Sequence, residues 1–396
     1  MKKKTFNLTI ILLLFAGCGG QRESRNDDFI KIDVTANYPN KELILQDFAD
    51  VEYVTLETND DFICQGQVMA VGKDIILAKN LNADGNIFIY DRNGKGLRKI
   101  NRKGQGGEEY LAAIGVVLDE YKGEIFVNNF LAGRTICVYD LYGKFKRRLN
   151  NENPVFSVFF QNDNDRDVFI GYNNSMEYNY KEDETKVFYH AIFSKSDRSV
   201  IQDIYIPFKE KKTPNARLRD GDMVWQDKFN YNAIIPYKGN FILSLPASDT
   251  VYTYFSDNRM LPFMVRKPSI QTMEREIFVF PQVLTEHFYF FLKVEKKKWE
   301  KVNDNPFVQS SLLYDRKDRT MYTCTVYNND YSIKKIVDMS QQELIGNDIA
   351  FWNIIQADAL VASYNKGELK EGKLKEIAAT LKEDDNPVIM IVKHKK

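Results

Sequence analysis

The residues with the clearest potential for chemistry lie in a glycine-rich stretch, Arg102 to Tyr110, that reads RKGQGGEEY. Its three glycines let the backbone turn sharply and approach a neighbour or a ligand closely. Arg102 and Glu108 could then point toward a central channel. The spacing fits neither a phosphate-binding Walker loop nor a dinucleotide fingerprint. We predict ligand contacts from Arg102 and Glu108, with the alternative of a crossing loop whose charges pair with each other.

Aromatic side chains next to polar residues are the second group of candidates. Trp225 and Tyr231 lie in WQDKFNYN, and Trp352 is followed by an asparagine. Rings in such surroundings can stack on a sugar or a peptide side chain. The alternative for all three is packing within the core.

Catalytic patterns are largely missing from the chain. It has three histidines, His190, His287 and His394, and they are far apart in the sequence. A three-histidine zinc site would need all of them. The chain contains no H-E-x-x-H and no G-x-S-x-G. We predict no catalytic residues, no metal and no cofactor. A calcium ion bound by oxygen ligands near residues 162–167 is left open. Whether the chain is an enzyme is also left open, and the missing patterns favour a protein without catalytic activity.

A repeated phrase indicates the elements that must position these residues. IFIYDRNGKGLRKI begins at Ile87, and ICVYDLYGKFKRRL begins at Ile136. In both, an apolar strand ends in Tyr-Asp, and after two further residues a Gly-Lys supplies the chemistry of a tight hairpin turn. Weaker copies follow, with register marks at Tyr90, Tyr139, Phe193, Tyr254 and Tyr314 and steps of 49, 54, 61 and 60 residues.

A period of this length, with three or four strands in each repeat, is typical of a β-propeller. Apolar strands that open the repeats begin near residues 74, 124, 167, 241, 287 and 348, which predicts six blades. The segment DIAFWNIIQADALVASY is expected to be a strand, and GELKEGKLKEIAATLKED a short helix. DVEYVTLET, from Asp50, has no repeat of its own. We expect it to close the ring by pairing with the C-terminal NPVIMIVK.

The N-terminus predicts export and lipidation. MKKKTFNLTIILLLFAGCGG has a basic start and a short apolar run, which is the pattern of a secretory signal and is too short to span a bilayer. Phe15-Ala16-Gly17-Cys18 resembles a bacterial lipobox, in which the cysteine carries the lipid. The alternative is an ordinary signal peptide with an incidental cysteine. Cys18 is therefore the predicted lipidation site.

Composition limits the remaining choices. Lys+Arg and Asp+Glu are both 55, so no overall positive charge favours nucleic acid. Beyond Cys18, three cysteines remain, Cys64, Cys137 and Cys324, each in an apolar context. An odd number without C-x-x-C spacing argues against a disulfide framework. We expect them to be small buried hydrophobic residues.

Several motifs together resemble a known family. The lipobox, VEYVTLET, the Tyr-Asp-x-x-Gly-Lys hairpin, RKGQGGEEY, SDTVY and DDNPVIMIVK occur in an order similar to that of the six-bladed β-propeller lipoproteins of Bacteroidetes, which are NHL-like propellers. The resemblance covers nearly the whole mature chain. It implies a fold and a location, and it supplies no catalytic residues.

The predicted organisation is a signal peptide over 1–17, a lipidated tether over 18–40 and an all-β, six-bladed propeller over 41–396. The expected function is a membrane-anchored binding or scaffold module for a glycan, peptide or partner protein. The alternative is a glycan-active lyase or hydrolase with its site at the channel mouth. We expect a monomer at the outer membrane, on the periplasmic or cell-surface side, that contacts the membrane through its lipid and binds no nucleic acid.

Overall fold

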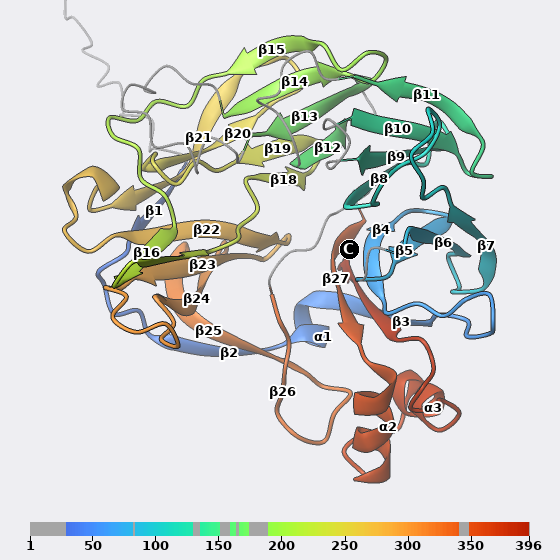
Figure 1. Cartoon of the computed structure of the whole chain (residues 1–396). Coiled ribbons are helices and arrows are strands. Elements are labelled where there is room, and N and C mark those ends of the chain that lie inside the picture. The colour runs from blue at the N-terminus through green and yellow to red at the C-terminus, as the bar shows by residue number, and fades with distance from the viewer. Residues whose placement is uncertain are drawn as a thin grey trace, which may run out of the picture.

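The computed structural model describes residues 29–81, 84–129, 135–150, 159–163, 166–173, 189–339 and 348–395. Within these ranges six small β-sheets are arranged in a ring, which is the arrangement of a six-bladed β-propeller (Figure 1). The predicted fold is therefore confirmed. The predicted signal peptide and Cys18 lie outside the described residues.

Blades 1 to 3 are four-stranded antiparallel sheets whose strands follow one another in the chain. Blade 1 consists of β4 (Gln67–Val71), β5 (Ile75–Lys79), β6 (Asn86–Asp91) and β7 (Gly96–Asn101). Blade 2 consists of β8 (Gly115–Asp119), β9 (Glu124–Asn129), β10 (Thr135–Asp140) and β11 (Phe145–Leu149). Blade 3 consists of β12 (Phe159–Asp163), β13 (Val168–Tyr172), β14 (His190–Ser194) and β15 (Val200–Ile204).

Blades 4 and 5 each gain a parallel strand from the N-terminal part of the chain. Blade 4 consists of β18 (Ile234–Tyr237), β19 (Asn240–Leu243), β20 (Thr250–Tyr254) and β21 (Met260–Lys267), with β1 (Ile30–Asp33) beside β21. Blade 5 consists of β22 (Ile277–Leu284), β23 (Phe288–Lys296), β24 (Phe307–Asp315) and β25 (Thr320–Asn328), with β2 (Asn40–Ile44) and the short β26 (Lys335–Ile336) beside β25. Strand β1 lies within the segment predicted as a tether.

Blade 6 closes the ring with strands from both ends of the chain. It consists of β27 (Ile349–Ile355), β28 (Val388–His394) and β3 (Ala49–Thr55), with β28 paired to both others. The predicted pairing of VEYVTLET with the C-terminal strand is thus confirmed. A one-turn helix, α1 (Leu45–Phe48), connects β2 to β3.

The repeated phrase forms the turn between the third and fourth strands. In blade 1, Asp91 Oδ1 accepts hydrogen bonds from the backbone N–H groups of Asn93 and Lys95. In blade 2, Asp140 Oδ1 accepts two from the equivalent residues of its own turn. The glycines have positive φ, +88° at Gly94 and +79° at Gly143, a conformation that costs glycine little. Aspartate and glycine therefore recur because this turn needs both.

Two sequence expectations differ from the structure. The apolar strands expected to open the repeats are β5, β9, β13, β19, β23 and β27, and in five blades another strand precedes them. No tight-turn signal precedes these first strands, which follow long connections between blades. The repeated phrase therefore did not reveal them. The second difference is α2 (Ala357–Asn365), which was expected to be a strand. Its buried Ala357 and Leu360 are three residues apart, which is helical spacing. It is followed by α3 (Lys373–Ala378), which confirms the predicted C-terminal helix.

The first strands line the centre of the ring, where β4, β8, β12, β18, β22 and β27 contact one another in turn. Between neighbouring blades lie apolar clusters, so the second and third strands are covered on both faces. This explains why β5 and β9 are buried along their whole length, while β7 and β11 keep exposed positions. Cys64, Cys137 and Cys324 are buried and free, as expected.

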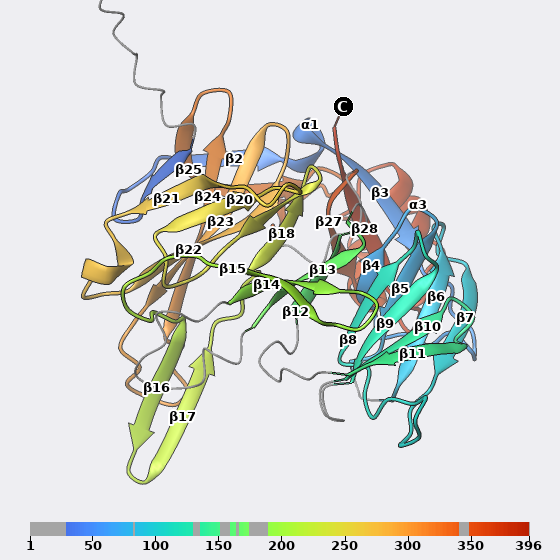
Figure 2. The same cartoon turned by 90° about the horizontal axis from the view of Figure 1, so that it is seen from above.

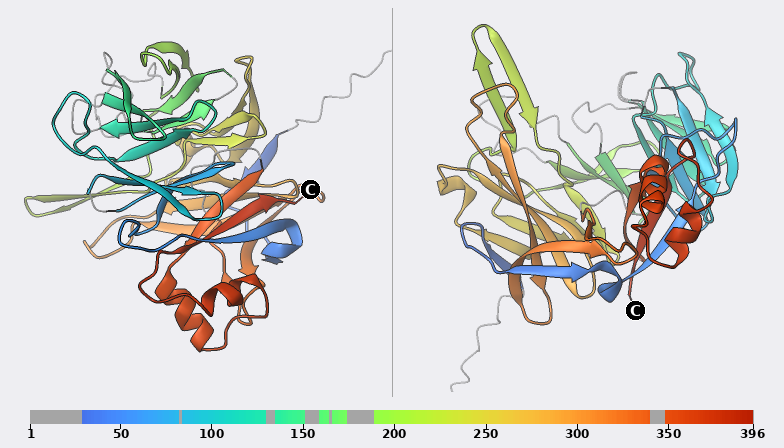
Figure 3. Two further views of the ribbon diagram at one scale, coloured as in Figure 1. Left: turned by 90° about the vertical axis from the view of Figure 1, so that its right-hand side faces the viewer. Right: turned by 90° about the horizontal axis from the view of Figure 1, so that it is seen from below.

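The two faces of the ring carry different connections. We call one the crossover face: it carries Asn80, Leu81, Asp84 and Gly85, between β5 and β6, and 102–114, between blades 1 and 2. A two-stranded hairpin, β16 (Asn215–Asp220) and β17 (Met223–Lys228), projects from the equivalent connection between blades 3 and 4. It points away from the end of the ring where the C-terminus lies (Figures 2 and 3). The opposite face carries the Asp-Gly turns, and we call it the turn face.

Candidate functional site

Two adjoining cavities open on the crossover face. The first lies between blades 1 and 2, has a volume of about 290 Å³, and is named the lysine cavity; it is lined by Gln67, Lys79, Asn80, Leu81, Asp84, Gly85, Asn86, Ala112, Ala113 and Ile114. The second, the tryptophan cavity, has a volume of about 570 Å³ and reaches across blade 6 to the end of blade 5. Gln67 and Leu81 line both. The two cavities are thus neighbours along one stretch of the channel mouth.

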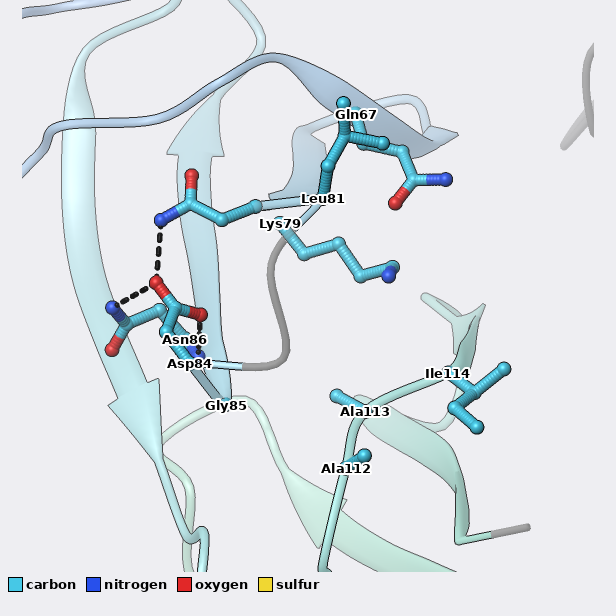
Figure 4. Close-up of a pocket in the computed structure, with 10 residues that line it drawn as sticks. Gln67, Lys79, Leu81, Asp84, Gly85, Asn86, Ala112, Ala113 and Ile114 are labelled. Atoms are coloured by element: carbon cyan, nitrogen blue, oxygen red, sulfur yellow. Dashed lines mark hydrogen bonds between the residues drawn. The ribbon is translucent and has the colours of Figure 1, made fainter.

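Lys79 is the unusual residue of the lysine cavity. It ends β5, and its exposed fraction is only 8%. Figure 4 shows its amine end pointing into the cavity, between Gln67 on one side and Ala113 and Ile114 on the other. Among the described residues Lys79 Nζ has no hydrogen-bond or ion-pair partner. Burial lowers the pKa of the Lys79 amine, because the charged form loses its hydration.

Asp84 faces the same cavity, but its carboxylate already accepts hydrogen bonds from residues close to it in the sequence. Its Oδ2 accepts hydrogen bonds from Asn80 Nδ2 at 2.6 Å and Asn86 Nδ2 at 2.8 Å, and its Oδ1 accepts one from Asn86 N at 2.9 Å (Figure 4). Gly85 O accepts a hydrogen bond from the buried Tyr110 hydroxyl at 2.7 Å. These bonds fix one wall of the cavity and leave the Lys79 amine without a direct partner.

Gln67 supplies the other polar group that faces the cavity. Its Oε1 is buried and has no hydrogen-bond partner among the described residues. A buried amide oxygen without a partner costs about 1–3 kcal/mol relative to a satisfied one. Gln67 and Lys79 are register partners in the β4–β5 ladder, which brings both side chains to the same end of blade 1. The cavity thus presents one cation and one unsatisfied amide side by side.

The tryptophan cavity has an apolar floor and an apolar rim. Trp352, Val337 and Met390 are buried beneath it. At the rim, Leu81 is 73% exposed and Ile336 is 66% exposed. The amide residues Gln65, Asn328, Asn353 and Gln356 also line this cavity. Leu81 separates this cavity from the lysine cavity, where Ile114 is a further exposed apolar residue.

The glycine-rich loop does cross from blade 1 to blade 2, but its charged residues face other partners. Arg102 Nε donates a hydrogen bond to Gly143 O at 3.0 Å, in a turn of blade 2. Glu108 is exposed, and its backbone oxygen accepts a hydrogen bond from the Tyr139 hydroxyl. The carboxylate of Glu109 instead organises the loop by accepting from Gly106 N at 2.8 Å. Neither Arg102 nor Glu108 lines the two cavities.

The three predicted aromatic residues are not brought together either. Trp225 is 41% exposed on the projecting hairpin. Tyr231 stacks on Phe280 with ring centroids 4.3 Å apart, and its hydroxyl is 2.5 Å from that of Tyr172. Trp352 is 1% exposed and belongs to the core between blades 6 and 1. Of the five predicted ligand-binding residues, Trp352 is the one that lines either of these two cavities, and it does so as part of the floor.

Over the described residues, no group of three or more His, Cys, Asp or Glu side chains is placed to hold a metal ion. In the segment considered for calcium, Asp163 instead accepts from Arg166 Nε at 2.7 Å, and positions 164–165 lie outside the described ranges. His190 is fully buried, and burial lowers its pKa to about 4. It is therefore neutral near pH 7 and enclosed within blade 3.

The sequence contained a signal for Lys79 that was not used. The strand DIILAKN is apolar up to the lysine, whose side chain falls on a strand that is buried throughout. A charged residue is rarely buried unless it is paired. The sequence does not show which residues surround Lys79. Ala112, Ala113 and Ile114 line the same cavity but belong to the connection that precedes the next blade.

A protein-family model, described as "Domain of unknown function (DUF4934)", matches residues 29–393. No curated protein resembles the chain closely enough to count as a match.

Among solved structures, a candidate exported protein of Bacteroides fragilis is similar, with a TM-score of 0.57 and 16% identity over 93% of this chain and 99% of that one. At this identity the likeness concerns the fold alone. A streptogramin B lyase has a TM-score of 0.33 and 7% identity over 74% of this chain and 97% of its own. A virginiamycin B lyase from Staphylococcus aureus has a TM-score of 0.33 and 8% identity over 72% and 94%. These two likenesses are too loose to bear on activity.

Proposed function

The chain belongs to the family described as a domain of unknown function (DUF4934), and from that premise we propose that it is an exported, lipid-anchored propeller that binds a ligand on its crossover face. The ligand is a glycan, a peptide or a segment of a partner protein. The observation that carries this proposal is the pair of adjoining cavities with exposed apolar residues at their rim, Leu81, Ile114 and Ile336.

The chemistry of the rim supports binding. Exposed leucine and isoleucine side chains beside a concave surface gain free energy when a ligand covers them, about 1.5–3 kcal/mol for a fully buried side chain. The amides of Gln65, Asn353 and Gln356 can orient a polar ligand across the same opening. Among the described residues, neither cavity is lined by a serine, cysteine or histidine.

The course of the N-terminal strands supports the proposed orientation. Strand β1 runs parallel to β21, which leads from the turn face to the crossover face. The chain therefore enters the ring from the side of the turn face. A membrane anchor attached at Cys18 would leave the crossover face directed away from the bilayer and open to ligands. The described residues contain no helix that is long and apolar enough to cross a membrane.

The test is a screen of glycan and peptide arrays with the purified full-length protein, followed by variants of the rim. Leu81→Asp and Ile336→Asp place a charge on the apolar rim and are expected to weaken binding of any hit about tenfold or more. Both side chains are more than half exposed, so the fold should tolerate them.

Tyr121→Asp is the matched control. Tyr121 is 88% exposed, and it lies in the turn between β8 and β9 on the turn face. It adds the same charge far from the cavities and should leave binding unchanged. If a ligand still binds both rim variants but no longer binds Tyr121→Asp, the binding surface lies on the turn face, and the proposal is overturned.

A further inference from the structure

We propose that the lysine cavity binds the carboxylate group of a small acid, with Lys79 Nζ as its cationic partner. The Gln67 amide oxygen would accept a hydrogen bond from a hydroxyl or N–H group next to that carboxylate on the ligand. This inference deepens the proposed function and rests on it. It assigns a chemical class of ligand to one end of the binding surface.

The first argument is the comparison of two buried lysines. Lys195 has a side chain only 2% exposed, and its Nζ lies 2.7 Å from Asp119 Oδ2, which is 1% exposed. That burial is compensated by an opposite charge. Lys79 is 8% exposed and its Nζ points into the lysine cavity, where it has no hydrogen-bond or ion-pair partner among the described residues and interacts with the Asp84 carboxylate only through space. Burying an unpaired charge is costly, and such charges in proteins usually have a partner. An anionic ligand in the cavity would supply the partner that Lys79 lacks.

The second argument concerns the charge of the ligand. The cavity offers one cation, and the Asp84 carboxylate in its wall is negative. Because Asp84 already offsets Lys79, a singly charged carboxylate leaves one net negative charge in the cavity, and a doubly charged phosphate or sulfate would leave two. Phosphate sites usually provide several donors or a planar arginine fork, which this lining lacks. The arrangement therefore favours a carboxylate over phosphate or sulfate.

The third argument is the unsatisfied oxygen of Gln67. Its Oε1 has no partner among the described residues, so an O–H or N–H of a bound ligand can donate a hydrogen bond to it. A carboxylate with a hydroxyl or an amide N–H close by meets both requirements, as in a sugar acid or an N-acylated amino acid. Opposite these polar groups, Ala112, Ala113 and Ile114 form an apolar wall for the ligand's carbon skeleton. The small alanine side chains leave the space that the ligand would fill.

The test is calorimetric titration of the full-length protein with three probes: D-glucuronate, N-acetylglycine and inorganic sulfate. At least one carboxylate should bind, and sulfate should bind more weakly. Glucuronate alone indicates a sugar acid as the source, and N-acetylglycine alone indicates a peptide end. Lys79→Met should lower carboxylate affinity at least about tenfold, as expected for a lost charge-assisted hydrogen bond. Gln67→Leu should lower it less.

Lys144→Met is the matched control, because Lys144 is exposed in the turn of blade 2 and its loss changes the net charge equally. A second measurement needs no variant: acylation of Lys79 by an amine reagent, followed by mass spectrometry, should be blocked by the bound carboxylate. Without ligand, Lys79→Met should melt at a temperature no lower than the natural protein, because an uncompensated buried charge is removed.

Three results would each overturn the inference: neither carboxylate binds, sulfate binds as well as they do, or Lys79→Met binds them like the natural protein. These outcomes leave the proposed function standing if array hits still depend on Leu81 and Ile336. Conversely, carboxylate binding that depends on Lys79 and is unaffected by substitutions of Leu81 and Ile336 would support the inference. That result would limit the binding surface to the lysine cavity.

Discussion

Val54 and Ile389 are register partners in blade 6, although they come from opposite ends of the chain. Val54 is 4% exposed and Ile389 is fully buried, and both pack in the core between blades 6 and 1. The ring is therefore closed by a strand that the N-terminal part of the chain must deliver. The parallel strands β1 and β2 lie beside blades 4 and 5 on the way to it.

This closure predicts unequal effects of two deletions. Removal of residues 19–58 should destabilise the whole ring, because it removes β3 and exposes the edge of β28. Removal of residues 19–28 should have little effect, since the first described strand begins at Ile30. Thermal unfolding of both truncated proteins checks this. Equal melting temperatures would contradict closure by the N-terminal strand.

A second prediction concerns Gly94, whose turn packs against the closing strand. A Cβ atom at Gly94 would lie 2.0 Å from Thr55 O, a backbone atom that cannot easily move. Gly94→Ala should therefore cost several kcal/mol, since strain adds to the unfavourable positive φ. Gly239 also has positive φ, +71°, but a Cβ there meets nothing within 4 Å. Gly239→Ala should cost only about 1 kcal/mol. Chemical denaturation measures both, and similar losses would show that the contact with Thr55 is unimportant.

A third prediction concerns the buried ion pair between blades 2 and 3. Lys195→Met leaves Asp119 buried without its partner and should destabilise the protein by about 3–5 kcal/mol. Lys334→Met is the control, because Lys334 pairs with Glu42 in another part of the ring, where both side chains are substantially exposed. Its loss should have little effect on stability, because water screens an exposed pair. Urea unfolding gives both values. A loss with Lys195→Met no larger than the control would mean that Asp119 is readily rehydrated.

A fourth prediction is acid sensitivity from His190. Burial lowers the pKa of His190 to about 4, below its ordinary value of 6.5. Between these values the unfolded chain binds a proton that the folded chain does not, so stability falls as the pH falls through this window. The contribution is about 3 kcal/mol. His190→Gln should reduce the loss of unfolding free energy between pH 7 and pH 4 by roughly this amount. An unchanged pH dependence would show that the imidazole is protonated within the fold.

A fifth prediction tests the anchor. Cys18→Ala should leave the protein without its lipid and release it from the membrane fraction, since attachment would depend on that lipid. The measurement is fractionation of cells that express each form, followed by immunoblotting. Ser24→Ala, in the same predicted tether, is a control that should remain with the membrane. Detergent-requiring membrane association of the Cys18 variant would exclude the lipoprotein assignment.

Much of the ring was determined by the sequence itself, because its signals are local. The turn at Asp91 and Gly94 needs only the residues within it, and the same chemistry recurs at Asp140 and Gly143. Apolar runs reveal β5 and β9, since strands covered on both faces exclude polar residues along their length. The Asp-Gly turn recurs in blades 1 and 2, and the six apolar strands counted along the chain are what predicted six blades.

The candidate site was decided only by the tertiary structure. Lys79 ends one blade's second strand, Gln67 begins its first, and Ala113 precedes the next blade, so their proximity depends on strand pairing and on how blades pack. Of the residues chosen from the sequence, Arg102 donates to a turn carbonyl, and Trp352 lies in the core at the floor of the tryptophan cavity. Residue type shows what a side chain can do. Whether it faces a cavity or a neighbour depends on contacts between distant segments, and these exist only in the closed ring.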